Sequence, residues 1–247
     1  MEDRVKTGIK GLDELIGGGL PKSSSILLSG EAGTGKTIFS LQYIYSGAKD
    51  FGEAGIYVTF EEKPEELRRE ALQFGWDLKK YEDLKKIVIL DAASLRVGVP
   101  TDENFYVKSD VDIKSLLSKL YEIAMDIDAK RIVIDSLPAF FFSNEPEKMR
   151  DDIYMMGRVL TETNATCILI TEIINGKGNS RFGYEEFITR GVITMHLVEG
   201  EKTMPRMAEY KRSIFIRKMR ETNHKIKQYP FSISKEGIVV YPQGEIY

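Results

Sequence analysis

Short runs of consecutive apolar residues recur along the first two thirds of the chain. They are rich in β-branched residues and do not alternate with polar ones, a pattern typical of strands that are buried on both faces of a parallel sheet. We expect five such strands, at Ile26–Ser29, Ile56–Phe60, Ile87–Leu90, Ile132–Ile134 and Thr166–Ile170.

Between most of these runs, apolar residues recur at spacings of three and four, the period of an amphipathic helix. In the third helical segment, for example, Ile113, Leu116 and Leu120 fall on one stripe. Strands that alternate with helices predict an α/β fold in which helices cover both faces of the sheet. The expected helices are Lys36–Phe51, Pro64–Phe74, Asp112–Asp128 and Glu147–Thr163.

The last third of the chain has a different pattern. Three strands, Gly191–Val198, Ser213–Met219 and Gly237–Tyr241, have no helix of comparable length between them, so we expect antiparallel hairpins. No internal repeat and no Pro/Ser-rich linker interrupts the chain. The sequence therefore predicts one domain over residues 1–247, with a mostly parallel sheet flanked by helices and a C-terminal antiparallel extension.

Composition excludes several classes of protein. The 247 residues are 42% hydrophobic and 30% charged, which excludes a disordered or collagen-like chain. A single cysteine, Cys167, excludes a disulfide framework and a multi-cysteine zinc site. The first ten residues are charged, and no apolar run approaches the roughly 20 residues that span a bilayer. We therefore expect a soluble, cytoplasmic protein with no membrane partner.

Charge is unevenly distributed along the chain. The net charge is −3, which argues against a general nucleic-acid coat protein. Segment 201–228 nevertheless holds nine Lys and Arg against three Asp and Glu, so it carries a charge of +6. The segment is either a solvated basic strand pair or the contact site of an anionic group.

A glycine-rich segment follows the first predicted strand and opens the first predicted helix. It fits the pattern G-x-x-x-x-G-K-[ST], whose glycines let successive backbone N–H groups surround phosphate oxygens. The N-terminus of the helix adds partial positive charge. In this pattern the lysine reaches the β- and γ-phosphates of ATP, and the hydroxyl that follows it ligates Mg²⁺. The residues are Gly30, Glu31, Ala32, Gly33, Thr34, Gly35, Lys36 and Thr37.

Carboxylates at the ends of two other strands could complete such a site. Asp135 ends a β-branched run and is the candidate second anchor for Mg²⁺; alternatively, it caps the turn that follows. Glu61 and Glu62 follow the strand Ile56–Phe60, and either could orient the attacking water. The alternative is a solvated acidic approach to the next helix.

The chain resembles a single KaiC-type domain of the RecA superfamily of P-loop ATPases. The resemblance runs from about Thr7 to Tyr241, whereas KaiC itself carries two such domains in tandem. Beyond the P-loop, it is carried by Thr7–Leu15 (TGIKGLDEL), Gly17–Pro21 (GGGLP), Thr59–Glu62 (TFEE), Phe74–Trp76 (FGW), Glu185–Phe187 (EEF) and Arg190–Val192 (RGV).

The resemblance implies roles that the patterns alone do not give. It makes Glu61 the general base with Glu62 as its support, and it places Thr171 and Glu172 near the γ-phosphate as sensors. It also implies that the strand Thr166–Ile170 lies between the P-loop strand and the strand that carries Asp135. Domains of this type form hexameric rings or helical filaments that bind ATP between neighbours.

In KaiC-like rings, a K-x-R-x-T-x-H stretch lends its charges to the neighbour's nucleotide. The matching residues here are Lys218, Met219, Arg220, Thr222 and His224. Strand periodicity predicts, independently of the resemblance, that Ile214, Ile216, Lys218 and Arg220 share one face. The alternative is a basic strand on the surface with no such role.

Three functions are compatible with these features. The leading one is a Mg²⁺-dependent ATPase that acts between the subunits of a ring. The second is a nucleotide-gated interaction module, with loops Phe140–Met149 and Asn175–Gly183 as its readouts. The third is single-stranded DNA binding, for which the loop at Asn175–Gly183 offers two cations and an aromatic residue. We interpret His196 as a core histidine and Trp76 as a packing residue.

Overall fold

The computed structural model describes residues 3–93, 101–107, 112–140, 146–173, 181, 183–199 and 210–244. Within these residues, the centre of the molecule is a nine-stranded sheet with the strand order β11-β10-β9-β8-β3-β7-β6-β4-β5. The strands are β3 (Ser25–Gly30), β4 (Gly55–Thr59), β5 (Ile87–Asp91), β6 (Arg131–Asp135), β7 (Thr166–Glu172), β8 (Gly191–Glu199), β9 (Tyr210–Met219), β10 (Gln228–Ser234) and β11 (Gly237–Val240).

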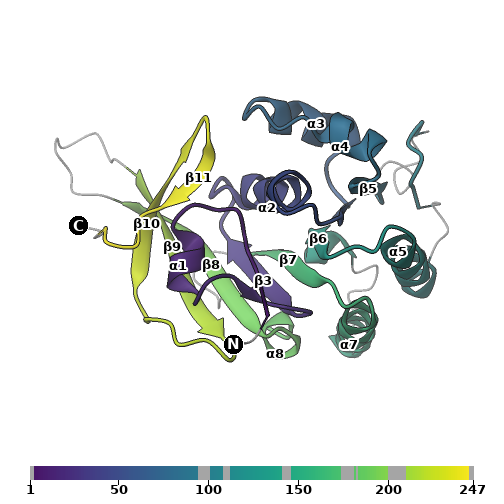
Figure 1. The fold of residues 1–247 in the computed structure, drawn as a ribbon. Coiled ribbons are helices and arrows are strands. Elements are labelled where there is room, and N and C mark those ends of the chain that lie inside the picture. Colours follow the sequence, from purple (N-terminus) through teal and green to yellow (C-terminus); the bar gives the residue numbers. More distant parts are fainter. Residues whose placement is uncertain are drawn as a thin grey trace.

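The sheet has a parallel part and an antiparallel part. Strands β5, β4, β6, β7, β3 and β8 are mutually parallel. Strands β9, β10 and β11 continue the sheet beyond β8 with antiparallel pairing (Figure 1). The predicted fold class is therefore confirmed, and β7 does lie between the P-loop strand β3 and the Asp135 strand β6.

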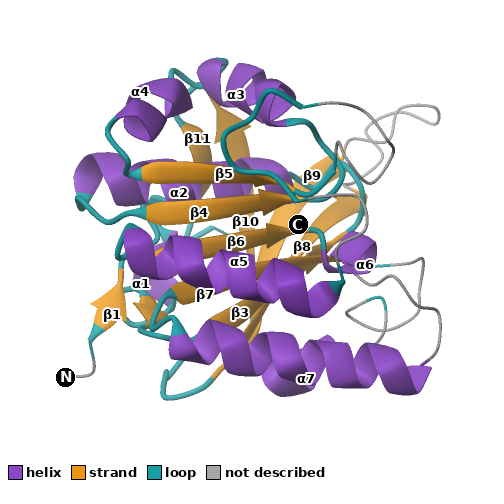
Figure 2. Ribbon diagram, turned by 90° about the vertical axis from the view of Figure 1, so that its right-hand side faces the viewer, coloured by secondary structure: helices purple, strands orange, loops and turns teal. Residues whose placement is uncertain are grey.

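Helices cover both faces of the sheet. On one face α2 (Lys36–Asp50), α3 (Pro64–Leu72), α4 (Leu78–Asp83) and the short α1 (Leu12–Leu15) pack around one apolar cluster. On the other face α5 (Ile113–Asp126) and α7 (Pro146–Glu162) pack around a second cluster and lie side by side (Figure 2). The remaining elements are β1 (Arg4–Val5), β2 (Leu20–Pro21), α6 (Leu137–Phe140) and α8 (Glu185–Ile188).

The predicted strands and long helices are all present, with ends that differ by one or two residues in most cases. Sequence periodicity missed α4, which has only six residues, and β10, which contains Pro230. Because β10 was missed, the predicted partner of the last strand was wrong. Strand β11 pairs with β10, and β10 in turn pairs with β9.

The prediction that Ile214, Ile216, Lys218 and Arg220 share one face of a strand is also wrong. The register of β8 against β9 shifts between Val192 and Ile193, so that Val192 pairs with Lys218 and Ile193 with Ile216. This bulge inserts one extra residue into β9 and reverses its alternation beyond that point. As a result Met219, rather than Lys218, joins Ile214 and Ile216 in the apolar cluster.

Trp76 and His196 lie outside the candidate site. Trp76 is 7% exposed and stacks on Phe74 with ring centroids 4.7 Å apart, as expected of a packing residue. His196 is only half-buried, so the interpretation as a core histidine is only partly correct. Its Nε2 lies 2.9 Å from Thr194 Oγ1, and burial lowers the pKa of the imidazole.

Candidate nucleotide-binding site

The glycine-rich segment is the turn between β3 and α2, at the carboxyl edge of the parallel strands. Gly33 and Gly35 have φ angles of 79° and 101°, in the left-handed region that favours glycine. A Cβ on Gly35 would lie 2.7 Å from Ile233 Cδ1, whereas one on Gly33 would meet no heavy atom within 4 Å. The loop is thus closely packed from behind and open in front, as a backbone cradle for phosphates must be.

Lys36 lies at the first position of α2 and folds back over this loop. Its Nζ donates hydrogen bonds of 2.9 Å to the carbonyl oxygens of Gly30 and Glu31. Burial lowers the pKa of Lys36, while the nearby carboxylates of Glu172 and Asp135 oppose that shift. The ammonium group is therefore held at the mouth of the cradle among carboxylates, where it can contact a phosphate.

Thr37 and Asp135 meet across α2 and β6. The Thr37 hydroxyl donates to Asp135 Oδ2 at 3.3 Å, and the Tyr57 hydroxyl donates to the same oxygen at 2.6 Å. Burial raises the pKa of Asp135 to about 6, against the effect of these two hydrogen bonds. A hydroxyl and a carboxylate oxygen beside a phosphate cradle are the kind of ligands that Mg²⁺ takes from a protein, with phosphates and water completing its shell. The residues present therefore fit the ion.

Glu61 and Glu62 follow β4 and have different surroundings. The Ser136 hydroxyl donates to Glu61 Oε1, which ties this carboxylate to the residue that follows Asp135. Burial, together with the charges of Glu70 and Asp135, raises the pKa of Glu62 to about 7. Glu61 thus lies on the side of the candidate metal ligand, and the half-buried Glu62 adjoins the acidic residues of α3.

The two predicted sensors end β7, directly beside the P-loop strand. Thr171 pairs with Ser29, and Glu172 with Gly30. The Thr171 hydroxyl is buried and donates to Glu185 Oε1 at 3.2 Å, so β7 is linked to the first residue of α8. The Glu172 carboxylate lies 3.5 Å from Arg181 Nη1. Both residues therefore border the cradle from the strand that neighbours it.

Sequence reasoning missed three side chains that organise this site. Tyr57 and Ser136 position Asp135 and Glu61 respectively, and the fully buried Glu185 accepts the hydrogen bond from Thr171. The only available signals were the adjacency of Ser136 to Asp135 and the EEF motif around Glu185. Periodicity could not identify Tyr57, because its contact joins two strands that are far apart in sequence.

The basic residues at the end of β9 and in the turn after it lie at the opposite end of the strands from this chain's own P-loop. Lys218 pairs with Val192, and Val192 pairs with Leu27, near the start of β3. Lys218 Nζ donates to the carbonyl oxygens of Glu186 and Thr189, at 2.9 and 2.6 Å. This lysine therefore holds the end of α8.

A sharp turn after β9 carries the other predicted neighbour-contacting residues. The exposed Arg220 begins the turn, and Glu221 has a φ of 56°, which is uncommon for a residue with a side chain. Arg4 secures the turn by donating from Nη2 to Glu221 O at 2.6 Å and from Nη1 to Thr222 Oγ1 at 2.7 Å. Arg190 forms an ion pair with Glu221, and its carbonyl oxygen accepts from the Arg220 N–H at 2.8 Å.

The two remaining residues of the predicted stretch, Met219 and His224, differ in accessibility. The side chain of Met219 is 4% exposed and packs in the apolar cluster, so only its backbone faces outward. His224 is half-buried, and its Nδ1 is buried with no hydrogen-bond partner among the described residues. The structure thus gathers Lys218, Arg220, Thr222 and His224 at one end of β9, while Met219 anchors that end to the core.

Similarity to known proteins extends over nearly the whole chain. A family model described as "ATPase: KaiC" matches residues 5–245. The chain belongs to the KaiC ATPase family. It is 40% identical to a UPF0273 protein of Pyrococcus furiosus, over 100% of this chain and 99% of that protein. The crystal structure of a KaiC-like protein from Pyrococcus horikoshii superimposes with a TM-score of 0.83 at 43% identity, over 98% of this chain and 100% of that one.

Longer members of the KaiC family match over part of their length. The circadian clock oscillator protein KaiC of Synechococcus elongatus is 35% identical over 98% of this chain, which covers 44% of that protein. The predicted resemblance to a single KaiC-like domain with a RecA-like fold is therefore confirmed. Among the described helices of this KaiC-family chain, none combines the length and apolarity that crossing a membrane requires.

Proposed function

We propose that this protein is a Mg²⁺-dependent ATPase whose chemistry takes place at the junctions between subunits of a ring-shaped homo-oligomer. One observation carries the proposal. Lys36, Thr37, Asp135 and Glu61 meet at the carboxyl ends of the parallel strands, whereas Lys218 and the turn that follows β9 lie at the opposite end of these strands. Membership of the KaiC ATPase family supports ATP as the nucleotide.

In this proposal the loop Gly30–Thr37 holds the phosphates through its backbone N–H groups and through Lys36. When ATP binds, Lys36 gives up its hydrogen bonds to the carbonyl oxygens of Gly30 and Glu31 and contacts the β- and γ-phosphate oxygens instead. Thr37 and Asp135 hold the Mg²⁺, with Tyr57 fixing the orientation of the aspartate. When bound, the ion neutralises charge on the phosphates and orients them.

Glu61 is the residue that we propose to orient and deprotonate the attacking water. Its hydrogen bond from Ser136 keeps the carboxylate beside Asp135, on the side of the nucleotide. Glu62 supports it by positioning the turn through its backbone oxygen, which accepts from Thr59 Oγ1 at 2.6 Å. Thr171 and Glu172 border the γ-phosphate position from β7 and act as sensors.

The P-loop site and the cations Lys218 and Arg220 lie at opposite ends of the parallel strands, and this placement favours a ring. In a head-to-tail contact, the carboxyl ends of the strands of one subunit meet the turn after β9 of the next subunit. This contact can repeat around a closed ring, for which we propose six subunits. Lys218 and Arg220 then stabilise negative charge on the neighbour's γ-phosphate, as an arginine finger does. Thr222 and His224 complete the contact together with the backbone of Met219.

The decisive test compares ATP hydrolysis and assembly mass for wild type, Lys36→Ala, Glu61→Gln and Arg220→Ala. We expect hydrolysis in the wild type only, and a wild-type assembly mass for Glu61→Gln. Wild-type rates in all three variants would exclude the proposed site. A monomeric mass with both ATP and ADP would exclude the ring.

A second candidate function is a nucleotide-gated interaction module with negligible turnover. The contacts of α8 favour it. Its first residue, Glu185, accepts a hydrogen bond from the Thr171 sensor, and Lys218 donates to the carbonyl oxygens of Glu186 and of Thr189, which directly follows the helix. Nucleotide binding in either subunit of a junction would then shift α8. The predicted readout loops are described only in part, because residues 141–145, 174–180 and 182 lie outside the described residues. Equal partner binding with ATP and ADP would refute this function.

Binding of single-stranded DNA, as in RecA-type recombinases, is the alternative that we do not favour. The loop on which it depends, Asn175–Gly183, lies almost entirely outside the described residues. Electrostatic binding to phosphates weakens steeply with added salt. Titration of a labelled oligonucleotide at low and at moderate salt decides the question, since no binding at low salt would exclude this alternative.

A further inference from the structure

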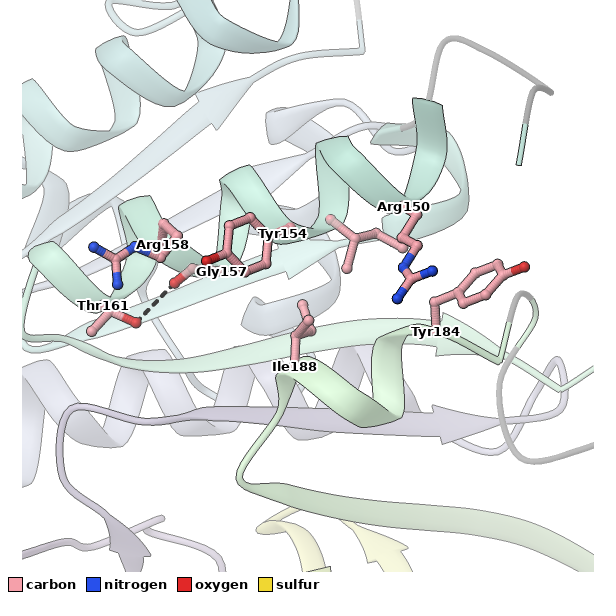
Figure 3. Close-up of a pocket in the computed structure, with 8 residues that line it drawn as sticks. Arg150, Tyr154, Gly157, Arg158, Thr161, Tyr184 and Ile188 are labelled. Atoms are coloured by element: carbon pink, nitrogen blue, oxygen red, sulfur yellow. Dashed lines mark hydrogen bonds between the residues drawn. The ribbon is translucent and has the colours of Figure 1, made fainter. Parts of the chain in front are cut away.

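A groove lies between α7 and α8, separate from the nucleotide site. It encloses about 610 Å³, within the range of roughly 300–1,000 Å³ that ligand pockets occupy. Its floor is formed by Ile153, Gly157 and Ile188, with Arg150 and Arg158 along one wall. Figure 3 shows the two arginines, Tyr154 and Tyr184 around this floor.

The groove owes its depth to a glycine in the middle of a 17-residue helix. Gly157 does not have the positive φ that only glycine adopts readily. A Cβ at this position would meet Ile188 at 3.7 to 3.8 Å, an ordinary van der Waals contact. Neither the backbone nor the packing therefore requires glycine, which is among the least favourable residues in a helix interior. What the glycine provides is open space above the floor.

The wall of the groove combines cations with exposed aromatic rings. Arg150, Tyr154 and Arg158 are spaced four residues apart and form one stripe along α7. Neither arginine forms an ion pair with a residue that the structure describes. Tyr154 is 66% exposed, and Tyr184, which directly precedes the facing helix α8, is 39% exposed. Tyrosine and arginine are the residues enriched where proteins bind partners.

We propose that this groove is a docking site for an acidic segment of a partner protein in extended conformation. Arg150 and Arg158 are eight helical residues apart, which corresponds to about 12 Å along the axis. Positions i and i+4 of an extended chain are about 13 Å apart and point to the same side. Two carboxylates with this spacing can therefore each meet an arginine, while an apolar side chain at i+2 enters the space above Gly157.

The charges around the groove favour a peptide over a nucleic acid. Asp151 and Glu162 are exposed on the same helix. A polyphosphate that follows α7 would pass close to these carboxylates, whereas a segment with two discrete carboxylates meets only the two arginines. The net charge of −3 also opposes general binding to nucleic acids.

Binding of a synthetic peptide to the full chain tests this proposal. The probe is fluorescein-labelled Gly-Glu-Ser-Phe-Ser-Glu-Gly, measured by fluorescence polarisation at low salt. We expect saturable binding that weakens at least tenfold in the double variant R150A/R158A, because both charge-assisted contacts are lost. Lys148→Ala is the matched control on the same helix, since Lys148 does not line the groove, and it should bind as the wild type does.

Substitution of Gly157 tests the groove without removing a charge. Gly157→Ala should fold like the wild type, because its Cβ makes only ordinary contacts, and should weaken peptide binding only slightly, because a methyl group fills little of the space above the floor. Gly157→Phe should abolish binding by filling the space above the floor, with circular dichroism confirming that the helix is intact. Unchanged binding in both R150A/R158A and Gly157→Phe would overturn the proposal. So would equal binding of a peptide with lysine in place of glutamate, or tighter binding of an oligonucleotide of equal charge.

Discussion

The half-buried Glu62 should make the stability of the fold depend on pH, even when no nucleotide is bound. Its carboxyl pKa is raised from an ordinary value of 4.5 to about 7, mainly by burial and then by the negative charges of Glu70 and Asp135. The folded protein therefore binds this proton more tightly than the unfolded chain does. Stability that derives from Glu62 is fully present below pH 4.5, falls as the pH rises from 4.5 to 7, and stays lost above pH 7.

Replacing Glu62 with glutamine removes the ionised form and keeps the shape of the neutral one. Each pKa unit corresponds to about 1.4 kcal/mol, so a shift from 4.5 to about 7 sets an upper bound of roughly 3.4 kcal/mol. Because the side chain is partly exposed and solvent screens it, we expect Glu62→Gln to stabilise the fold by about 1 to 2 kcal/mol at pH 8. At pH 4.5 we expect no change.

Urea unfolding of the nucleotide-free protein at several pH values measures this difference directly. The control is Glu122→Gln, which replaces an exposed glutamate on α5 and should leave stability unchanged at every pH. A second variant, Glu70→Gln, should lower the pKa of Glu62 by removing the first of its charged neighbours. A stabilisation by Glu62→Gln that is equal at pH 4.5 and pH 8 would refute the electrostatic reasoning.

Three further predictions concern nucleotide binding, turnover and docking. Gly35→Ala should weaken ATP binding in calorimetry more than Gly33→Ala does. Both substitutions carry the strain of a positive φ, about 1–2 kcal/mol, and only Gly35→Ala also forces Ile233 to move. Arg4→Gln should lower kcat for ATP hydrolysis with little change in KM, because the turn at Thr222 loses the hydrogen bond from Arg4. Arg4→Lys should restore part of the rate. An unchanged kcat in Arg4→Gln would refute this role. If nucleotide binding shifts α8, the acidic peptide should bind with different affinity in the presence of ATP and of ADP. Equal affinity would argue against such a shift.

The parallel half of the fold and the phosphate loop could be predicted because local patterns determine them. Uninterrupted β-branched runs indicate buried strands, and the G-x-x-x-x-G-K-T pattern indicates a turn between a strand and a helix. The place of Asp135 at the end of β6 could be predicted for the same reason, and its role as a metal ligand stays a prediction. The residues that hold these groups in place could not be predicted, because Tyr57 and Arg4 act across contacts between segments far apart in sequence.

The errors concern the antiparallel part of the sheet, where register rather than composition decides orientation. Strict alternation predicted that Lys218 faces the same way as Ile216, but a single extra residue in β9 turned Lys218 away and brought Met219 inward. Nothing in the local sequence marks that bulge. Strand β10 was missed because Pro230 reads as a strand breaker, although here it occupies a position of β10 that pairs with Ser213.

The most direct test of the account is ATP hydrolysis by mixed oligomers. Lys36→Ala subunits have a defective P-loop and an intact β9 turn, and Arg220→Ala subunits have the reverse. If each site is built from two subunits, each variant alone should be inactive, and an equal mixture should recover about a quarter of the wild-type rate, the share of junctions with both halves intact. No recovery from variants that co-assemble at the wild-type mass would contradict the claim that ATP is hydrolysed between subunits.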